Sequence, residues 1–498
     1  MGIFSRRFFL KSLLPSSIAT LVGVAHASEE KDGNAKKISG INDGKVYVDD
    51  FGADPTGRTD STGAVMRAIQ SIAGISNSRF HPDASRYARV IFGAGVYVVA
   101  DIPFLSGIVY SGMGRWATRI VPRTGSSFAF NTSGTLNYAE SKANAKMRLI
   151  SAGLKDMSIG CELQDFTLNK IPQGSGAVRI ANASYFILEN VVIRSLNGCG
   201  LQLEEVWDSD FTNLRIMGVG NASNINKPVP GLYIGPGDNK FDGSNALRFR
   251  GLHIEDCAQL MQLDVRTRHV FFTSPKLEGT NTIASNTITG GIGITFDCPE
   301  LTWQFPDKPM FTIDYKNQNE GVGIVFESPS MISSDRDGRH GWYFLHKENP
   351  FGLLVINNPF MRSVSKLFEG GNAVISGGTA HACGPSIIRA FGQVFINNLH
   401  LKFIRPQNSN KEDYTLHLSG EANVIKNCSF ESFNSRNAAS SIIYMDETCI
   451  NNIVADNFFF GSRDHAIECH HENKNTINGN IISQNSKYSS LINKKTGG

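Results

Sequence analysis

The chain has 498 residues, of which 41% are hydrophobic and 19% are charged, and this composition excludes a disordered chain. Its 48 Lys and Arg residues nearly balance 45 Asp and Glu residues, for a net charge of +3, which gives no electrostatic argument for binding nucleic acid. Beyond the N-terminal segment, no apolar run is long enough to span a bilayer. We therefore expect a folded protein with no nucleic-acid partner and no stable membrane span.

The first residues have the features of an export signal. Residues 5–11 read SRRFFLK, an apolar stretch follows at 13–24, and residues 25–27 read AHA, the small-residue pattern of a cleavage site. The heptapeptide resembles the twin-arginine consensus, which implies a bacterial protein that the twin-arginine translocase exports in folded form. We therefore expect a signal peptide at 1–27, a polar leader at 28–44 and a periplasmic or secreted location.

A capping helix is predicted after the leader. Asp60 or Ser61 can act as the N-cap of a helix that runs through Ile72. The apolar residues of this segment recur with helical spacing, so that one face of the helix can cover the open end of a larger core. These residues are Val65, Met66, Ile69 and Ile72.

The segment around this helix carries a family resemblance. Residues 46–69 read VYVDDFGADPTGRTDSTGAVMRAI, and residues 90–98 add a strand, a tight glycine turn and a second strand. This arrangement resembles the start of the rhamnogalacturonase/epimerase-like pectate lyase superfamily, which includes many tailspike and exopolysaccharide-acting proteins. The resemblance implies a right-handed parallel β-helix at 45–485, followed by a polar tail at 486–498, and a polysaccharide ligand. It does not fix the chemistry, because one fold supports many functions.

A repeating unit organises the rest of the chain. Each unit is a short strand with alternating apolar residues, and the units lie 23 to 40 residues apart, which indicates a solenoid without helical repeats. The pattern predicts an all-β fold, a right-handed parallel β-helix of about 12 rungs with an N-terminal capping helix. The 40-residue gap is expected to hide a further rung at 374–380, and a loop insertion is expected at 221–245. The repeated segments are 163–168, 188–193, 211–216, 249–254, 272–277, 296–301, 326–331, 356–361, 396–401, 425–430, 454–459 and 477–482.

The third residue of each segment is small or Asx. Such residues tolerate the left-handed backbone of a tight corner, and a stacked Asn can hydrogen-bond to its copy one rung away. We assign this column a structural role. The residues of this column are Asp165, Asn190, Asn213, Gly251, Ser274, Cys298, Ser328, Asn358, Asn398, Asn427, Asp456 and Gly479.

The eight cysteines are scattered without a CxxC or zinc-like spacing, and most of them fall within apolar strand patterns. We therefore predict buried thiols rather than a disulfide framework, and we predict no metal and no cofactor.

Charged side chains gather on three consecutive rungs. Side chains alternate along a strand, so residues on either side of the last buried residue must point outward, about 4.8 Å from their equivalents on the next rung. This places the candidate catalytic residues in one patch beside Arg215, a candidate substrate-binding residue. The insertion at 221–245 is expected to form a wall above it. The candidate catalytic residues are His253, Glu255, Lys276, Glu278 and Glu300.

Several chemistries fit this patch. Two carboxylates about 5–5.5 Å apart suit a retaining glycosidase and about 6.5–9.5 Å an inverting one, for which Glu300, Asp256 or Asp264 could supply the second group. A lyase would use His253, Lys276 or a Tyr as base, with Arg215 neutralising a uronate. The alternative is a solvated charged strand face without catalysis. Polygalacturonase motifs are missing from the rungs, so pectin is poorly supported as a substrate.

Aromatic residues supply a second carbohydrate signal. Exposed rings stack on sugar faces, and Trp303 and Trp342 are the surface candidates for substrate binding. We expect an exported protein that cleaves glycosidic bonds of a bacterial surface polysaccharide by hydrolysis or β-elimination. The alternatives are a non-catalytic polysaccharide-binding protein for exopolysaccharide assembly and a uronan epimerase. Related tailspikes form trimers, but neither the leader nor the tail has a heptad pattern that would drive a homotrimer.

Overall fold

The structure is a computed structural model, and it describes most of the chain after Asp43. The predicted signal peptide, nearly all of the leader and one predicted repeat, 163–168, lie outside the described residues. The described residues are 44–73, 88–132, 148–161, 175–220, 227–237, 242–280, 282–305, 307–315, 321–332, 342–349, 351–381, 387–404, 414–432, 441–461, 465–483 and 490–494.

A short helix covers the first turn, as predicted. It is α1 (Thr62–Ala73), and it contacts the 3-10 helix η3 (Val48–Phe51). The carboxylate of Asp60 accepts a hydrogen bond from the backbone N–H of Thr62 at 2.9 Å. The apolar face of α1 is buried against the core through Val65, Ile69 and Ile72. The helix thus shields the end of the hydrophobic core from water.

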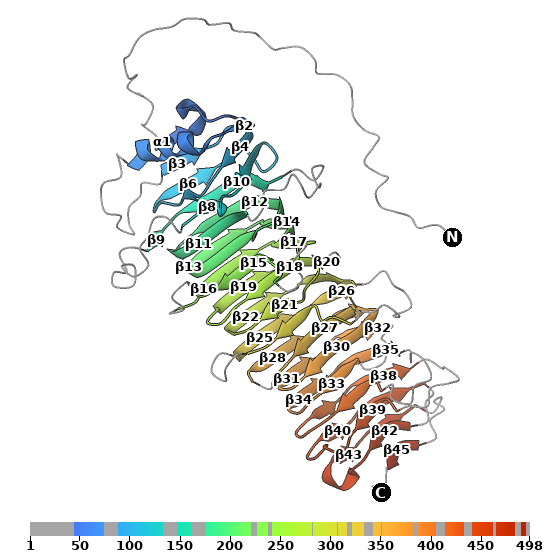
Figure 1. The fold of residues 1–498 in the computed structure, drawn as a ribbon. Coiled ribbons are helices and arrows are strands. Elements are labelled where there is room, and N and C mark those ends of the chain that lie inside the picture. Colours follow the sequence, from blue (N-terminus) through green and yellow to red (C-terminus); the bar gives the residue numbers. More distant parts are fainter. Residues whose placement is uncertain are drawn as a thin grey trace, which may run out of the picture. The chain divides into compact units, whose positions relative to one another are not determined.

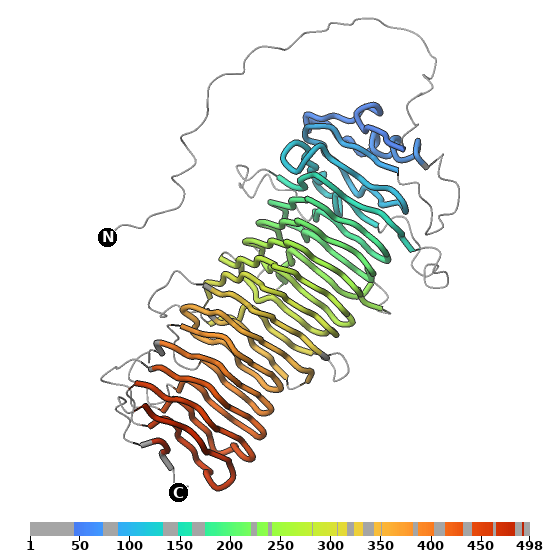
Figure 2. The backbone as a smooth tube through the Cα atoms, turned by 180° about the vertical axis from the view of Figure 1, so that it is seen from behind, coloured from blue at the N-terminus to red at the C-terminus, as the bar shows by residue number. Residues whose placement is uncertain are grey.

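The strands form a parallel β-helix (Figures 1 and 2). Successive turns stack in chain order, and every pairing between described strands is parallel. This is the right-handed parallel β-helix that the repeat predicts. Each turn contributes to three columns of strands, which we call the first, second and third columns. The long strands β10 and β12 bend from the first column into the second, and β13 bends from the third into the first.

The bounds of the strands follow, column by column. The first column contains β1 (Lys45–Tyr47), β3 (Ala88–Ile91), β6 (Ile108–Ser111), β10 (Gly153–Gly160), β12 (Ile187–Leu196), β13 (Leu201–Thr212), β16 (Asn245–Arg250), β19 (Arg268–Thr273), β22 (Gly291–Asp297), β25 (Gly321–Glu327), β28 (Leu353–Asn357), β31 (Ala373–Ser376), β34 (Val394–Asn397), β37 (Val424–Lys426), β40 (Ile453–Ala455) and β43 (Thr476–Asn478). The second column adds β2 (Thr56–Asp60), β4 (Gly95–Val99), β7 (Thr118–Pro122), β14 (Arg215–Val219), β17 (His253–Glu255), β20 (Lys276–Gly279), β23 (Glu300–Trp303), β26 (Ser330–Ile332), β29 (Phe360–Arg362), β32 (Thr379–His381), β35 (His400–Ile404), β38 (Ser429–Ser432), β41 (Phe458–Phe460) and β44 (Ile481–Ile482). The third column adds β5 (Ile102–Pro103), β8 (Phe128–Asn131), β9 (Leu149–Ile150), β11 (Gly176–Ser184), β15 (Pro230–Gly235), β18 (Gln259–Leu263), β21 (Asn286–Ile288), β24 (Phe311–Ile313), β27 (Trp342–Lys347), β30 (Val364–Gly370), β33 (Ile388–Ala390), β36 (Leu416–Leu418), β39 (Ile443–Met445), β42 (His465–Cys469) and β45 (Ser490–Lys494), and a 3-10 helix, η6 (Glu472–Lys474), precedes β43.

The corner between the first and second columns is made by the predicted small and Asx residues. Every described member of that column has a left-handed backbone, with φ between 47° and 65°. The amide of Asn213 donates to Asn190 at 3.0 Å, and the amide of Asn190 donates to Asp156 at 2.6 Å. The prediction of stacked, hydrogen-bonded corners is therefore confirmed. Asp165 lies outside the described residues.

Stacked phenylalanines fill the interior of the first column. Phe211, Phe249, Phe272, Phe296 and Phe326 are buried, and neighbouring rings in this order lie 4.5 to 4.9 Å apart between centroids. The separation equals the spacing of neighbouring strands, so identical side chains at one register position must stack. The second-column strands that carry the candidate site follow directly after the strands of this ladder in each turn.

The extra rung in the 40-residue gap is confirmed. β31 pairs with β28 and β34, and β32 pairs with β29 and β35. The predicted insertion at 221–245 is wrong in its described part, because β15 is a regular third-column strand that pairs with β13 and β18. It forms a side of the solenoid and no wall above the patch. The last described strand, β45, pairs with β42, so the solenoid continues into the predicted tail.

The predicted surface role of Trp303 is wrong, because its side chain is fully buried and its indole N–H donates to the carbonyl of Lys308 at 2.8 Å. The backbone of Trp342 lies in β27, but its side chain lies outside the described residues. Most described cysteines are buried as predicted, whereas Cys298 is exposed and Cys383 lies outside the described residues. Among the described residues, no helix combines the length and hydropathy that a membrane crossing needs.

Candidate functional site

The candidate residues lie on the outward face of the second column, as the alternation predicts. Their strands, β14, β17, β20 and β23, are consecutive, and each pairs with the next. The register aligns Arg215, His253, Lys276 and Glu300 in one row. A parallel row two residues further on contains Glu255 and Glu278. The predicted patch therefore exists, although β15 does not wall it in.

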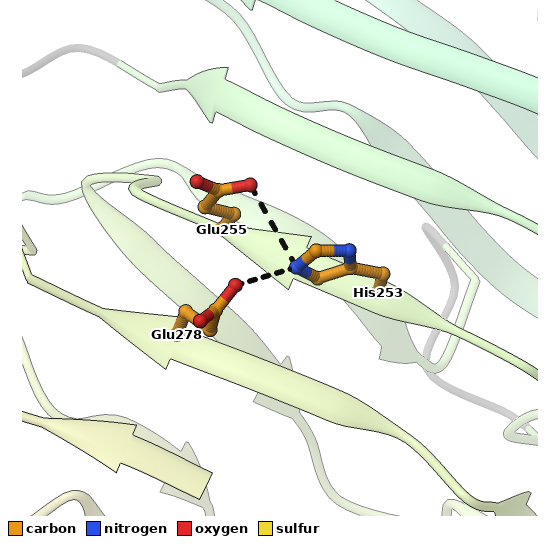
Figure 3. Close-up of side chains that lie close together, drawn as sticks. All are labelled: His253, Glu255 and Glu278. Carbon is orange, nitrogen blue, oxygen red and sulfur yellow. Dashed lines mark hydrogen bonds and ion pairs between the residues drawn. The ribbon is translucent and has the colours of Figure 1, made fainter. Parts of the chain in front are cut away.

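Three of these side chains meet at one nitrogen atom (Figure 3). Nε2 of His253 is 2.8 Å from Oε2 of Glu278 and 3.7 Å from Oε2 of Glu255. All three side chains are less than a third exposed. Nε2 of His253 and Oε2 of Glu278 share one hydrogen bond, and the tautomer of the imidazole decides which atom donates. Glu255 and Glu278 lie on neighbouring strands, so their carboxylates would repel each other if nothing lay between them. The imidazole of His253 lies between the two.

Two cations complete the cluster. Nη2 of Arg215 is 3.2 Å from Oε2 of Glu255, and Nζ of Lys276 is 3.4 Å from Oε1 of Glu278. Nζ of Lys276 also lies 3.1 Å from Glu300. Partial burial disfavours the charged form of Lys276, but Glu300 and Glu278 outweigh this effect and raise the pKa of Lys276. Lys276 therefore stays a cation at neutral pH, which suits charge neutralisation better than proton abstraction.

Other residues that the sequence offered as second carboxylates lie elsewhere. Glu300 is at the edge of the cluster, with its side chain 63% exposed and bound only to Lys276 among the contacts of the patch. The hydroxyl of Thr280 donates to the carboxylate of Asp256. Asp264 accepts from Tyr233 and Thr289 on the third column. Asp256 meets Glu278 through the backbone, where its N–H donates to the carbonyl of Glu278, whereas Glu255 and Glu278 are the carboxylates that lie next to Nε2 of His253.

The sequence analysis did not single out Trp116, an exposed aromatic residue on this side of the solenoid. Trp116 lies in the corner between β6 and β7, and it is 66% exposed. This corner does not follow the repeated segment, so alignment of the rungs passes over it. The signal that could have found it is the break in that pattern after Gly112, where a long corner carries an Arg-Trp pair.

The ligand atoms of His253, Glu255 and Glu278 lie within 4.8 Å of one another, a spacing at which they could hold a divalent cation. The sequence analysis predicts no metal. The absence of a metal stays a prediction, and Arg215 and Lys276 are the cations that contact the two carboxylates.

We expect that treatment with EDTA leaves any polysaccharide-cleaving activity unchanged, since the cluster has its own cations. The measurement is the initial rate of chain shortening before and after chelation and dialysis. Loss of the rate, with recovery on adding Zn²⁺ or Mn²⁺, would contradict the prediction and assign the three side chains to a metal.

The comparisons with known proteins place this geometry in context. No protein-family model matches the chain. Among curated proteins, it is similar to the capsule KN3-specific depolymerase 1 of Klebsiella phage KN3-1, with 21% identity over 281 residues. The match covers 56% of this chain and 34% of that protein, so the chain spans about a third of the relative's length.

Two solved structures share the fold. Over 90% of its length, the chain is similar to the pre-mature gene product 12 of bacteriophage phi29, with 11% identity and a TM-score of 0.54, covering 56% of that chain. The N-terminal fragment of the same phage protein gives 12% identity and a TM-score of 0.52, covering 90% of this chain and 71% of the fragment. At these identities the likeness establishes a shared fold.

Proposed function

We propose that the protein is a depolymerase that hydrolyses glycosidic bonds of a bacterial surface polysaccharide at Glu255 and Glu278. The observation that carries the proposal is the convergence of these two carboxylates on Nε2 of His253, on an outward strand face. Similarity to a phage protein named as a capsule-specific depolymerase supports the substrate class.

The short distance between the carboxylates favours a retaining mechanism. The ligand oxygens of Glu255 and Glu278 lie within 4.8 Å of each other, which leaves no room for the water that an inverting pair holds at about 6.5–9.5 Å. In a retaining reaction, one glutamate attacks the anomeric carbon as a carboxylate while the other, in its carboxylic acid form, protonates the leaving oxygen. The second glutamate, now ionised, takes a proton from the water that breaks the sugar–enzyme bond, which releases the sugar and restores the acid.

The contacts argue against elimination at this site. A lyase needs a proton acceptor, and Nε2 of His253, the candidate acceptor, is already engaged in a hydrogen bond with Glu278. Lys276 is held as an ammonium by Glu278 and Glu300. Tyr233 lies on the third column, where burial and the carboxylate of Asp264 raise its pKa. The positioning of the carboxylates by His253 fits hydrolysis better.

Export and location follow from the same proposal. A depolymerase of a surface polysaccharide acts outside the cytoplasm, and the twin-arginine-like segment at 5–11 supplies a route to the periplasm or the medium. The alternatives from the sequence are β-elimination, uronan epimerisation and polysaccharide binding without turnover.

One experiment separates these functions. The purified protein is incubated with a panel of acidic and neutral bacterial surface polysaccharides, and chain length is followed by size-exclusion chromatography together with the ultraviolet absorbance of unsaturated products. We expect shortening without new absorbance. Shortening with absorbance would mean a lyase, and altered sugar identity at constant length would mean an epimerase. Binding without either change would overturn the enzymatic proposal.

A further inference from the structure

The corner between β6 and β7 differs from the later corners on the same side of the solenoid. In later turns two residues join the first and second columns, and the first of the two has a left-handed backbone. Here the chain uses residues 112–117, and both Met113 and Trp116 are exposed. The corner therefore places two large apolar side chains together at the surface, and exposed apolar patches of this kind mark interaction sites.

Two arginines fix the Trp116 ring. The guanidinium carbons of Arg115 and Arg194 each lie 5.6 Å from its centroid, within the range of a cation–π interaction. Arg194 lies on β12, far from Trp116 in the sequence. The Trp116 ring therefore contacts a strand of the solenoid as well as its own corner. An anchored, exposed ring flanked by guanidinium groups can bind the apolar face of a sugar and a carboxylate attached to it.

The register connects this corner with the carboxylates. Arg194 pairs with Met217, and Met217 pairs with Glu255, so Arg194 and Glu255 occupy one outward row. Two strand spacings separate them, or about 10 Å. A short oligosaccharide spans that distance. A polymer that lies along the stacking direction of the strands can therefore contact Trp116 and the two glutamates together.

The charge along the second column changes between these two points. Outward second-column positions carry Arg119 on β7, Arg194 on β12 and Arg215 on β14, whereas β17, β20 and β23 carry Glu255, Glu278 and Glu300 beside His253 and Lys276. The basic end favours an anionic sugar, and the acidic end disfavours one. The polarity would fix both the position and the direction of an acidic polymer.

We propose that Arg115, Trp116 and Arg194 form a subsite for a uronic-acid unit, which makes the substrate an acidic polysaccharide bound across the second column. The inference rests on the proposed function for the location of bond cleavage, but the subsite itself is a binding site that can be tested alone. Trp116 contacts the face of the sugar ring, and the guanidinium of Arg194 binds its carboxylate.

The test measures binding with variants of the full chain that carry Glu278→Gln, so that polymers are not consumed. The probes are uronate-containing bacterial polysaccharides and the same polymers after chemical reduction of their carboxyl groups. We expect Trp116→Ala to weaken binding of the acidic polymers by about tenfold or more. Reduction of the polymer's carboxyl groups should weaken its binding to the parent protein by a similar factor. The same reduction should have much less effect on binding to Arg194→Gln, because the carboxylate would then have lost the guanidinium with which it interacts.

Matched controls come from the first column. Phe395→Ala removes another exposed aromatic ring, and Arg250→Gln removes another exposed arginine, and both should leave binding unchanged. Thermal unfolding of each variant shows whether the fold is retained. The loop position of Trp116 favours retention, and Trp116→Phe provides a second variant that should keep most of the affinity.

The outcomes separate the subsite from the proposed function. Equal binding of acidic and reduced polymers, wild-type affinity in Trp116→Ala, or no binding of any acidic polymer would overturn the subsite. A wild-type protein that shortens only neutral polymers retains the proposed function and loses the subsite. A protein that shortens nothing, but binds acidic polymers through Trp116, loses the proposed function and retains the subsite.

Discussion

Replacing Glu278 with glutamine should lower the turnover number for polysaccharide cleavage by about 10²–10⁴-fold, the range expected when a positioned acid or base is removed. The amide keeps the shape of the side chain but cannot attack an anomeric carbon or exchange a proton. Because Arg194 of the Trp116 subsite lies three strand spacings from Glu278, or about 14 Å, the affinity for the polymer should change much less than the rate. The measurements are initial rates by reducing-end release and dissociation constants for the same polymer.

The control for Glu278 is another partly exposed glutamate in an ion pair. Glu189 lies on the first-column part of β12 and pairs with Lys155 at 2.5 Å. Its side chain is 48% exposed, and such surface pairs contribute little to stability. Glu189→Gln should therefore retain the full rate. If Glu278→Gln also retained it, the cluster would be a charged strand face without a role in catalysis.

Replacing Phe272 with alanine should lower the free energy of unfolding by about 3–5 kcal/mol, as for other large buried aromatic residues. Its ring stacks on Phe249 at 4.9 Å and on Phe296 at 4.7 Å between centroids. The substitution therefore leaves a cavity lined by one face of each neighbouring ring. Because each turn of a solenoid contacts only its neighbours, the loss cannot be spread over a larger core. Urea unfolding followed by circular dichroism measures the change.

The preceding residue is the matched control. Phe271 is 46% exposed because alternation turns it outward from the same strand, β19. Phe271→Ala changes the same amount of side chain in the same turn and should lower the free energy of unfolding by less than about 1 kcal/mol. Equal losses for the two variants would show that the stacked interior does not carry the stability of this turn.

The sequence predicted the position of the charged side chains well where strict alternation applied. The rule that neighbours of a buried residue point outward placed Arg215, His253 and Glu278 on one face, and the strand register aligns them as expected. The same rule, applied one residue further, would have placed Trp303 inside. It lies two residues after Leu301, and both side chains are buried.

The remaining features could not be derived from the repeat. Side-chain rotamers decide that the imidazole of His253 lies between two glutamates, and no spacing rule specifies them. Trp116 lies in a corner without a counterpart in the aligned segments. The aligned segments follow the corner between the first and second columns. Because β15 belongs to the third column, the segment at 221–245 had no counterpart in that alignment and was predicted to be an insertion.

The stacking of strands makes distance along the second column a whole number of steps. The subsite at Arg194 and the glutamate at 255 are two steps apart, and each step is one complete turn of the chain. Gain or loss of one turn between them would shift the cleavage position by about 4.8 Å along a bound polymer. The residues of the subsite and of the catalytic pair would both stay the same. Duplication of one repeat in such a gene would therefore change the position of cleavage, and with it the length of the products, without changing the residues that cleave the bond.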